Sequence, residues 1–203
     1  MKHPALALLA AACAALLMPL CGCAQAPDAT STPNPKDTAP MNPQPKTLVA
    51  VFSATGTTKG VAERLASAIG ADFHEIVPPA PYTPADRDWR DKQSRSSVEM
   101  ADRASRPAIA GAAPDLSAYG TVFVGFPIWW YREPSIIDTF VERNADALAG
   151  KTVVPFATSG GRGMGVSTAN LQALAPAARV LEGRRFRASV PAEDLKAWAE
   201  SCR

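Results

Sequence analysis

A run of hydroxyl-bearing residues lies between an apolar segment and an amphipathic one. The residues that could hold an anion there are Ser53, Ala54, Thr55, Gly56, Thr57 and Thr58. Four hydroxyls and several backbone N–H groups at a helix N-terminus favour a phosphate. The GxxxxGK spacing of a triphosphate loop is absent, so nucleotide-triphosphate hydrolysis is not expected. In the alternative, Thr57 or Thr58 simply caps the helix, but a cap needs one hydroxyl rather than four.

Three consecutive aromatic residues follow a second apolar segment. The run is Pro127-Ile128-Trp129-Trp130-Tyr131-Arg132-Glu133-Pro134. Three aromatic side chains cannot all point inward from a turn after a strand, so at least one should face solvent or a ligand. A flat aromatic ligand stacked on an indole would use such a surface. In the alternative, the rings cover the sheet or are buried in a protein interface.

Glycine is concentrated in a third segment, Thr158-Ser159-Gly160-Gly161-Arg162-Gly163-Met164-Gly165. Glycine lets the backbone approach a ligand closely, so peptide groups can serve as the recognition surface. The candidate binding residues are Thr158, Ser159, Gly160, Gly161 and Gly163. A flexible connector is the alternative.

Side chains that could catalyse a reaction are otherwise few. The domain has one histidine, His74, for which a structural role is predicted, and it has no Cys–His pair and no HExxH metal motif. Asp138 and Glu142 share a predicted helix face and are interpreted as a solvated pair. No cysteine pair is available for a disulfide, since Cys202 is the only free thiol expected in the domain. The net charge of +2, without a Lys/Arg block, excludes strong attraction to nucleic acid.

The elements that must position these segments alternate along the chain. Apolar runs predict strands over residues 48–52, 73–77, 121–126 and 152–156, with a short fifth at 180–181. Helical spacing of apolar residues follows these runs, at 61–69, 136–141, 171–178 and 195–202. Residues 82–106 carry 11 charged side chains and are interpreted as a solvated helix or a long loop.

Such alternation predicts an α/β fold, a five-stranded parallel sheet with helices on both faces. Ligands of these sheets bind outside the carboxyl ends of the strands. The three candidate segments each follow a predicted strand, so we expect them to meet at one edge of the sheet.

With these motifs at these positions, residues 47–200 resemble the flavodoxin-like FMN-binding family, and residues 125–165 most resemble a bacterial flavodoxin subfamily. The resemblance implies that residues 53–58 hold the FMN phosphate, that Trp129 in Gly125-Phe126-Pro127-Ile128-Trp129 stacks on the flavin, and that Gly160-Gly161 contacts its pyrimidine edge. The third segment lacks the tyrosine that often covers the second flavin face. Tyr131, Tyr82 and Trp89 are the alternatives. Family members are commonly acidic, whereas this domain is near neutral, so its redox partner need not be basic.

The first 46 residues predict an exported lipoprotein. Lys2 and His3 precede an apolar run over 4–20, as in a signal peptide. Leu20-Cys21-Gly22-Cys23 resembles a bacterial lipobox, which implies a signal over 1–22 and lipidation of Cys23. Residues 23–46 contain six prolines and predict a disordered tether. The alternative is an ordinary signal peptide. Ala24 lacks the inner-membrane signal of the Asp type, so we expect a periplasm-facing anchor in the outer membrane.

Three functions remain open for the flavodoxin-like domain, residues 47–203. The first is an FMN electron carrier, tethered to the membrane, that serves a redox partner protein still to be identified. The second is an FMN-dependent reductase that passes hydride from NAD(P)H to a quinone-type acceptor. The third is a binding module that has kept the fold without flavin. Nicotinamide cofactors should be scarce outside the cytoplasm, which favours the carrier.

Overall fold

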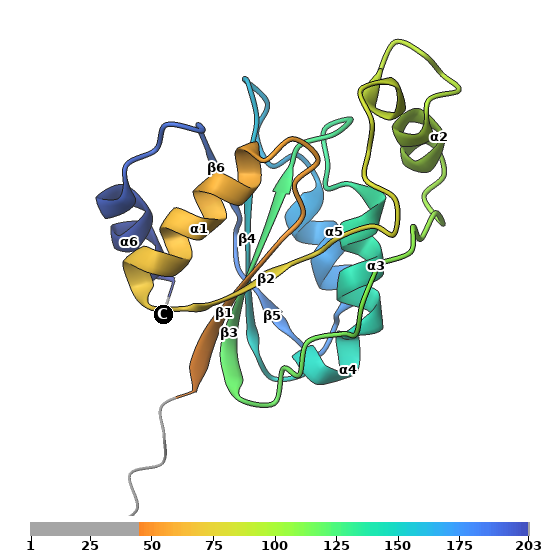
Figure 1. Cartoon of the computed structure of the whole chain (residues 1–203). Helices are drawn as coiled ribbons and strands as arrows, with labels where there is room; N and C mark the ends of the chain where they lie inside the picture. Colours follow the sequence, from red (N-terminus) through yellow and green to blue (C-terminus); the bar gives the residue numbers. More distant parts are fainter. Residues whose placement is uncertain (1–44, 203) are drawn as a thin grey trace, which may run out of the picture. The chain divides into compact units, whose positions relative to one another are not determined.

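The structure is a computed structural model that describes residues 45–202. The predicted signal peptide, Cys23 and nearly all of the predicted tether lie outside the described residues. Figure 1 shows a central sheet with helices on both of its faces. The strands are β1 (Lys46–Val51), β2 (Asp72–Glu75), β3 (Tyr119–Pro127), β4 (Thr152–Thr158), β5 (Arg179–Val180) and β6 (Arg184–Phe186). The helices are α1 (Thr57–Ile69), the 3-10 turn η1 (Ala85–Arg87), α2 (Arg95–Ala101), α3 (Ser135–Arg143), α4 (Ala145–Leu148), α5 (Ser167–Leu174) and α6 (Ala192–Ser201).

The sheet has the strand order β2-β1-β3-β4-β5, with every pairing parallel. This arrangement confirms the predicted five-stranded parallel sheet with helices on both faces. Two short strands, β5 and β6, share the edge position beside β4, which the sequence did not predict. β5 pairs with the start of β4, at Thr152 and Val153, whereas β6 pairs with its end, from Phe156 to Thr158.

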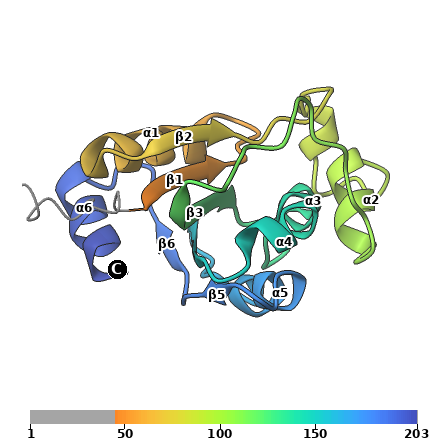
Figure 2. The same ribbon diagram turned by 90° about the horizontal axis from the view of Figure 1, so that it is seen from below.

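The alternation of apolar residues along the strands builds two cores, one on each face. On β1, Leu48 and Ala50 point to one core and Val49 and Val51 to the other. Helices α1 and α6 cover one face, and α3, α4 and α5 cover the opposite face (Figure 2). Because both faces are covered, the central strands are apolar throughout.

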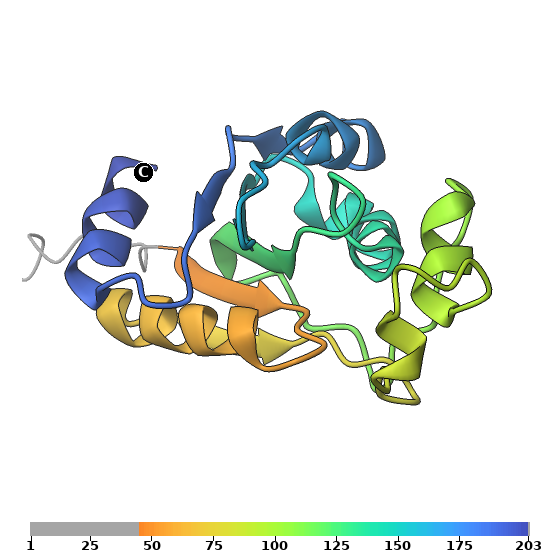
Figure 3. The same ribbon diagram turned by 90° about the horizontal axis from the view of Figure 1, so that it is seen from above.

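The carboxyl edge of the sheet contains the point at which the strand order reverses. β1 and β3 are neighbours there, but α1 leaves β1 toward one face and α3 follows β3 toward the other. Figure 3 looks onto this edge from above. A crevice between the two loops is the general ligand position in open sheets of this kind.

The charged segment between β2 and β3 forms an excursion that combines short helices with loops. It holds η1 and α2 and lies beyond α3, beside the carboxyl edge (Figure 1). Ser94 caps α2 by accepting a hydrogen bond from the N–H of Ser97. The Ser135 hydroxyl at the start of α3 donates to the Glu99 carbonyl at 3.0 Å, which ties α2 to the body of the domain.

Candidate functional site

The three candidate segments meet at the carboxyl edge of the sheet. We call them the first loop (residues 53–58, including the start of α1), the second loop (127–134) and the third loop (158–165). The buried hydroxyls of Thr58 and Thr158 lie 2.8 Å apart and connect the first loop to the third. The N–H of Ile128 donates to the Thr158 carbonyl at 3.1 Å and connects the second loop to the third. The loops therefore form one continuous surface.

The first turn of α1 has no side-chain cap. Gly56 is the N-cap residue, with φ of 83°, and no side chain bonds to the first N–H groups of the helix. The alternative in which Thr57 or Thr58 caps the helix is therefore wrong. The Thr58 hydroxyl bonds to Thr158 instead, and the Thr57 hydroxyl lies 3.2 Å from that of Thr55. The uncapped N–H groups remain free to bind an anion.

The first loop also contains a buried hydroxyl, that of Ser53. This hydroxyl has no hydrogen-bond partner within residues 45–202. A buried polar atom without a partner loses its hydration without compensation. A ligand with acceptor oxygens would remove that penalty. The first loop therefore fits a phosphate.

A hollow of about 530 Å³ lies between the three loops, and we call it the first hollow. The predicted site residues that line it are Thr55, Thr57, Pro127, Ile128, Trp129, Thr158, Ser159 and Gly160. The remaining predicted residues, which do not line it, are Ser53, Ala54, Gly56, Thr58, Trp130, Tyr131, Gly161 and Gly163. Ser53 and Ala54 border a smaller hollow of about 180 Å³ beside Tyr82. Within residues 45–202, no carboxylate lines the first hollow.

Two residues of the first hollow were not predicted. Arg187 and Ala188 follow β6 and line the hollow together with the threonines of the first loop. A signal for them was present, because the run Arg184-Arg185-Phe186-Arg187 follows the predicted fifth strand. A run that follows the last predicted strand lies on the carboxyl side of that strand, which is the side of the candidate site. Arg187 brings a positive charge to the hollow.

The aromatic residues form a tight turn with unusual backbone angles. Trp129 and Arg132 exchange two backbone hydrogen bonds of 2.9 Å. Between them, Trp130 has φ of 43° and Tyr131 has φ of 66°. Two consecutive positive φ angles define a turn that normally takes asparagine or glycine. The aromatic turn, residues 129–132, is therefore strained and must be held by its surroundings.

The three rings of the turn have different environments. Trp129 packs edge-on against Phe52 and Tyr82, with ring centroids 5.7 and 5.3 Å apart, and is half-buried. Trp130 is 42% exposed and Tyr131 is 59% exposed. As expected, the rings do not all point inward. Tyr82 is buried and is not free to cover a flavin, whereas Tyr131 and Trp89 remain exposed.

A cluster of buried charged side chains, built around Arg132, holds the aromatic turn in place. Nη1 of Arg132 donates to Oδ2 of Asp138 at 2.9 Å and to Oε1 of Glu133 at 3.3 Å. Nη2 donates to the Ser135 hydroxyl at 3.1 Å. Asn170 on α5 donates to Glu133 at 2.8 Å. These contacts position the aromatic turn, and sequence reasoning assigned none of them a role.

The interpretation of Asp138 and Glu142 as a solvated pair is wrong for Asp138. Its side chain is buried, and burial together with Glu133 raises its pKa to about 7. Glu142 is exposed and accepts a 2.6 Å hydrogen bond from Arg106.

His74 lies on β2 and its ring stacks on that of Phe140, and burial lowers the pKa of the imidazole.

The third loop presses on the aromatic turn at Gly165. A Cβ at this position would lie 1.8 Å from the carbonyl oxygen of Tyr131, and Gly165 has φ of 57°. Only glycine allows this approach without a backbone shift. The Arg162 guanidinium carbon lies 4.6 Å from the centre of the Tyr131 ring. The second and third loops are therefore in close contact at Gly165 and at Arg162.

The sheet order and the position of the loops define the class, an open doubly wound α/β protein with a candidate ligand site at its switch point. The sequence model of the flavodoxin family matches residues 46–202, and the chain belongs to that family. The resemblance inferred from the loops is confirmed. No curated protein sequence matches the chain significantly.

Several solved structures share the fold. A proposed flavoprotein from Bacteroides eggerthii DSM 20697 is 47% identical, with a TM-score of 0.72 over 78% of this chain and 98% of that one. A similar protein from Bacteroides uniformis ATCC 8492 is 46% identical, with a TM-score of 0.71 over 77% of this chain and 98% of that one. A flavoprotein from Lactobacillus acidophilus NCFM, solved in complex with FMN, is 21% identical, with a TM-score of 0.60 over 76% of this chain and 99% of that one.

Two further properties concern the described residues alone. Between residues 45 and 202, no helix has the length and hydropathy needed to cross a membrane. In the same part of the chain, His, Cys, Asp and Glu side chains form no group of three or more that could bind a metal ion.

Proposed function

We propose that the domain binds FMN in the first hollow and acts as an electron carrier. The observation that carries the proposal is the uncapped start of α1 at a hollow that Trp129 also lines. The unpartnered hydroxyl of Ser53, in the same loop, supports it. A phosphate and a flat isoalloxazine ring are the two ends of FMN. The complex of the Lactobacillus relative with FMN supports the same ligand on this fold.

Each residue has a distinct part in the proposal. The first N–H groups of α1 and the Ser53 hydroxyl would bind the phosphate, and Arg187 would add positive charge nearby. Trp129 would stack on the flavin, and the glycines of the third loop would offer peptide groups to its polar edge. Bound FMN would supply the electron-transfer chemistry, and the protein would set its environment.

Replacing Trp129 tests the site. Trp129→Ala should weaken FMN binding about tenfold, because a stacked aromatic pair contributes about 0.5–1.5 kcal/mol beyond the area it buries. Phe73→Ala, at an exposed aromatic residue on β2 that lines neither the first hollow nor the aromatic turn, is the control and should leave the affinity unchanged. Titration of FMN into the purified domain, followed by flavin fluorescence, measures both. Equal affinities for the two variants would show that Trp129 does not stack on the flavin.

Two measurements separate the carrier from its alternatives. Purified protein mixed with NADPH and menadione should oxidise NADPH slowly, and rapid oxidation would favour the reductase. A colourless protein that gains no absorbance near 450 nm after incubation with FMN would favour a flavin-free binding module.

We also propose that Cys23 carries a lipid that anchors the exported chain to a bacterial membrane, with the outer membrane favoured. The support is the sequence Leu20-Cys21-Gly22-Cys23 after an apolar run. Cells fed a radioactive fatty acid should label the wild-type protein and Cys21→Ala, but not Cys23→Ala. Labelling of Cys23→Ala would contradict the assignment.

A further inference from the structure

We propose that a second hollow beside the proposed flavin site binds a small planar aromatic anion. This hollow has a volume of about 520 Å³ and lies between the aromatic turn, the third loop and the excursion that holds η1 and α2. It shares Ile128 and Trp129 with the first hollow but includes no residue of the first loop. The position of this hollow next to a flavin rests on the proposed function. The binding of an aromatic anion by its own lining residues does not.

Aromatic rings make up most of its wall. Trp89, Trp129, Trp130 and Tyr131 all line the second hollow. Trp89 is 67% exposed, and Trp130 and Tyr131 are also exposed. Several large rings left uncovered around one hollow are typical of a binding site. The volume lies within the range of about 300–1,000 Å³ that is usual for small-molecule sites, which favours a small ligand over a protein partner.

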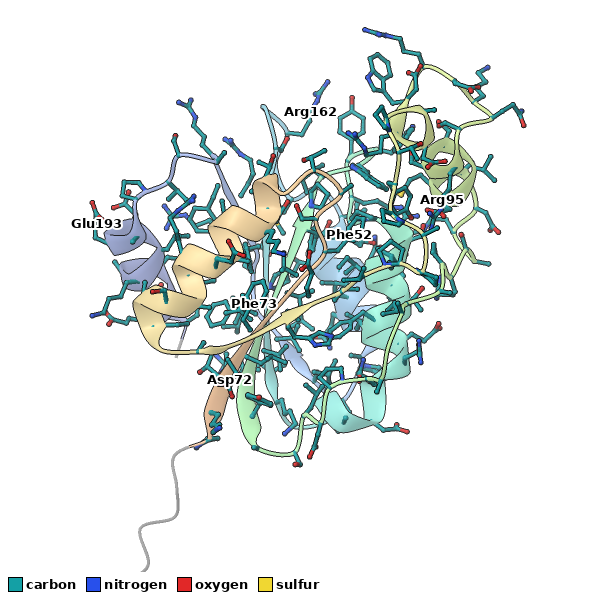
Figure 4. All side chains as sticks on the ribbon, viewed as in Figure 1. Phe52, Asp72, Phe73, Arg95, Arg162 and Glu193 are labelled. Atoms are coloured by element: carbon teal, nitrogen blue, oxygen red, sulfur yellow. The ribbon has the colours of Figure 1, made fainter. Side chains whose placement is uncertain are left out.

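The charges at this hollow select an anion. Arg87 and Arg162 line it, and no carboxylate does. Among the ion pairs within residues 45–202, none involves either arginine. Figure 4 shows Arg162 on the loop after β4, at the end of the molecule from which the α2 segment also extends. Its stacking on Tyr131 keeps a positive charge at the edge of the hollow.

Two buried polar atoms near the hollow lack partners. Nε of Arg87 and the hydroxyl of Ser96 are buried and form no hydrogen bond with any described residue. Both residues line the hollow. Uncommitted donors beside aromatic walls fit the carboxylate of a flat aromatic acid, because a buried donor without an acceptor is unfavourable.

The test uses 2-naphthoate as the probe, since it is planar, anionic and redox-inactive. Its uncharged amide, 2-naphthamide, and the non-aromatic cyclohexanecarboxylate are the comparison ligands. Calorimetric titration of the full domain, with and without FMN, gives the affinities. We expect 2-naphthoate to bind at least about tenfold more tightly than either comparison ligand, as expected when a charged hydrogen bond and a stacked ring both contribute.

Variants locate the binding. Arg162→Gln and Trp89→Ala should each weaken 2-naphthoate binding about tenfold. Arg179→Gln, which removes an exposed arginine on β5 that lines neither hollow, should leave it unchanged. Equal binding of 2-naphthoate and its amide, or equal effects of Arg162→Gln and Arg179→Gln, would overturn the proposal.

The FMN titration separates the two proposals. If Arg162→Gln and Trp89→Ala lower the affinity for FMN instead of 2-naphthoate, the second hollow holds the flavin and the proposal is wrong. If the protein binds no FMN but binds 2-naphthoate with the expected dependence on Arg162, the second hollow stands and the proposed function fails.

Discussion

Gly165 offers a direct test of whether the third loop supports the aromatic turn. Gly165→Ala places a methyl group 1.8 Å from the Tyr131 carbonyl oxygen, and a backbone atom cannot move aside as a flexible side chain would. The positive φ should cost about 1–2 kcal/mol. Overpacking against the turn should add about 1–3 kcal/mol. We therefore expect the free energy of unfolding to fall by about 2–5 kcal/mol.

Gly150 supplies a matched control. It has φ of 72°, but a Cβ there would meet no heavy atom within 4 Å. Gly150→Ala should therefore show the backbone cost alone, about 1–2 kcal/mol. Urea unfolding measures both variants, and FMN titration should show weaker binding only for Gly165→Ala, because the turn carries Trp129. Equal losses of stability in the two variants would refute the role assigned to the contact.

Three further predictions concern buried polar groups of the site. Burial raises the pKa of Asp138 from 3.8 to about 7, so the folded state holds this proton more tightly than the unfolded chain does. This proton therefore contributes at most about 4 kcal/mol to the free energy of unfolding. The contribution is fully present below pH 4 and is lost as the pH rises through 7. Asp138→Asn should flatten that dependence in urea titrations, whereas Glu142→Gln should preserve it. Thr58→Val should destabilise the domain by about 1–3 kcal/mol, and the double variant with Thr158→Val should recover part of the loss, since no hydroxyl is then left unpaired. Ser53→Ala should stabilise the ligand-free domain in thermal unfolding, since it removes a buried hydroxyl without a partner, and should weaken the binding of FMN more than that of riboflavin. A destabilised ligand-free domain, or an equal loss of affinity for both flavins, would contradict its phosphate role.

The sequence predicted those features that depend on the residues of a single element, such as the burial of a strand and its direction. The apolar run at the start of the domain required both faces of β1 to be buried, and the two cores follow from that. The meeting of the three loops followed from the strand direction alone, because carboxyl ends of parallel strands share an edge.

Features that depend on contacts between distant segments were not predictable. Asp138 and Glu142 occupy equivalent places on one helix face, and only the packing of Arg132 over α3 buries the first. The angles of Trp130 and Tyr131 carry no sequence signal, since the turn lacks the usual asparagine or glycine. β6 has three residues, too few to show a period, so Arg187 was not placed at the site.

The parallel arrangement of the sheet also places the start of β1 and the candidate site at opposite ends of the domain. The chain enters β1 at Lys46, at the edge opposite the three loops. Six residues of strand at about 3.3 Å each separate that entry from the carboxyl edge by about 20 Å. An anchor at Cys23, as proposed, would attach to the pole of the domain remote from both hollows. Both hollows would then open at the end of the domain that the tether does not enter.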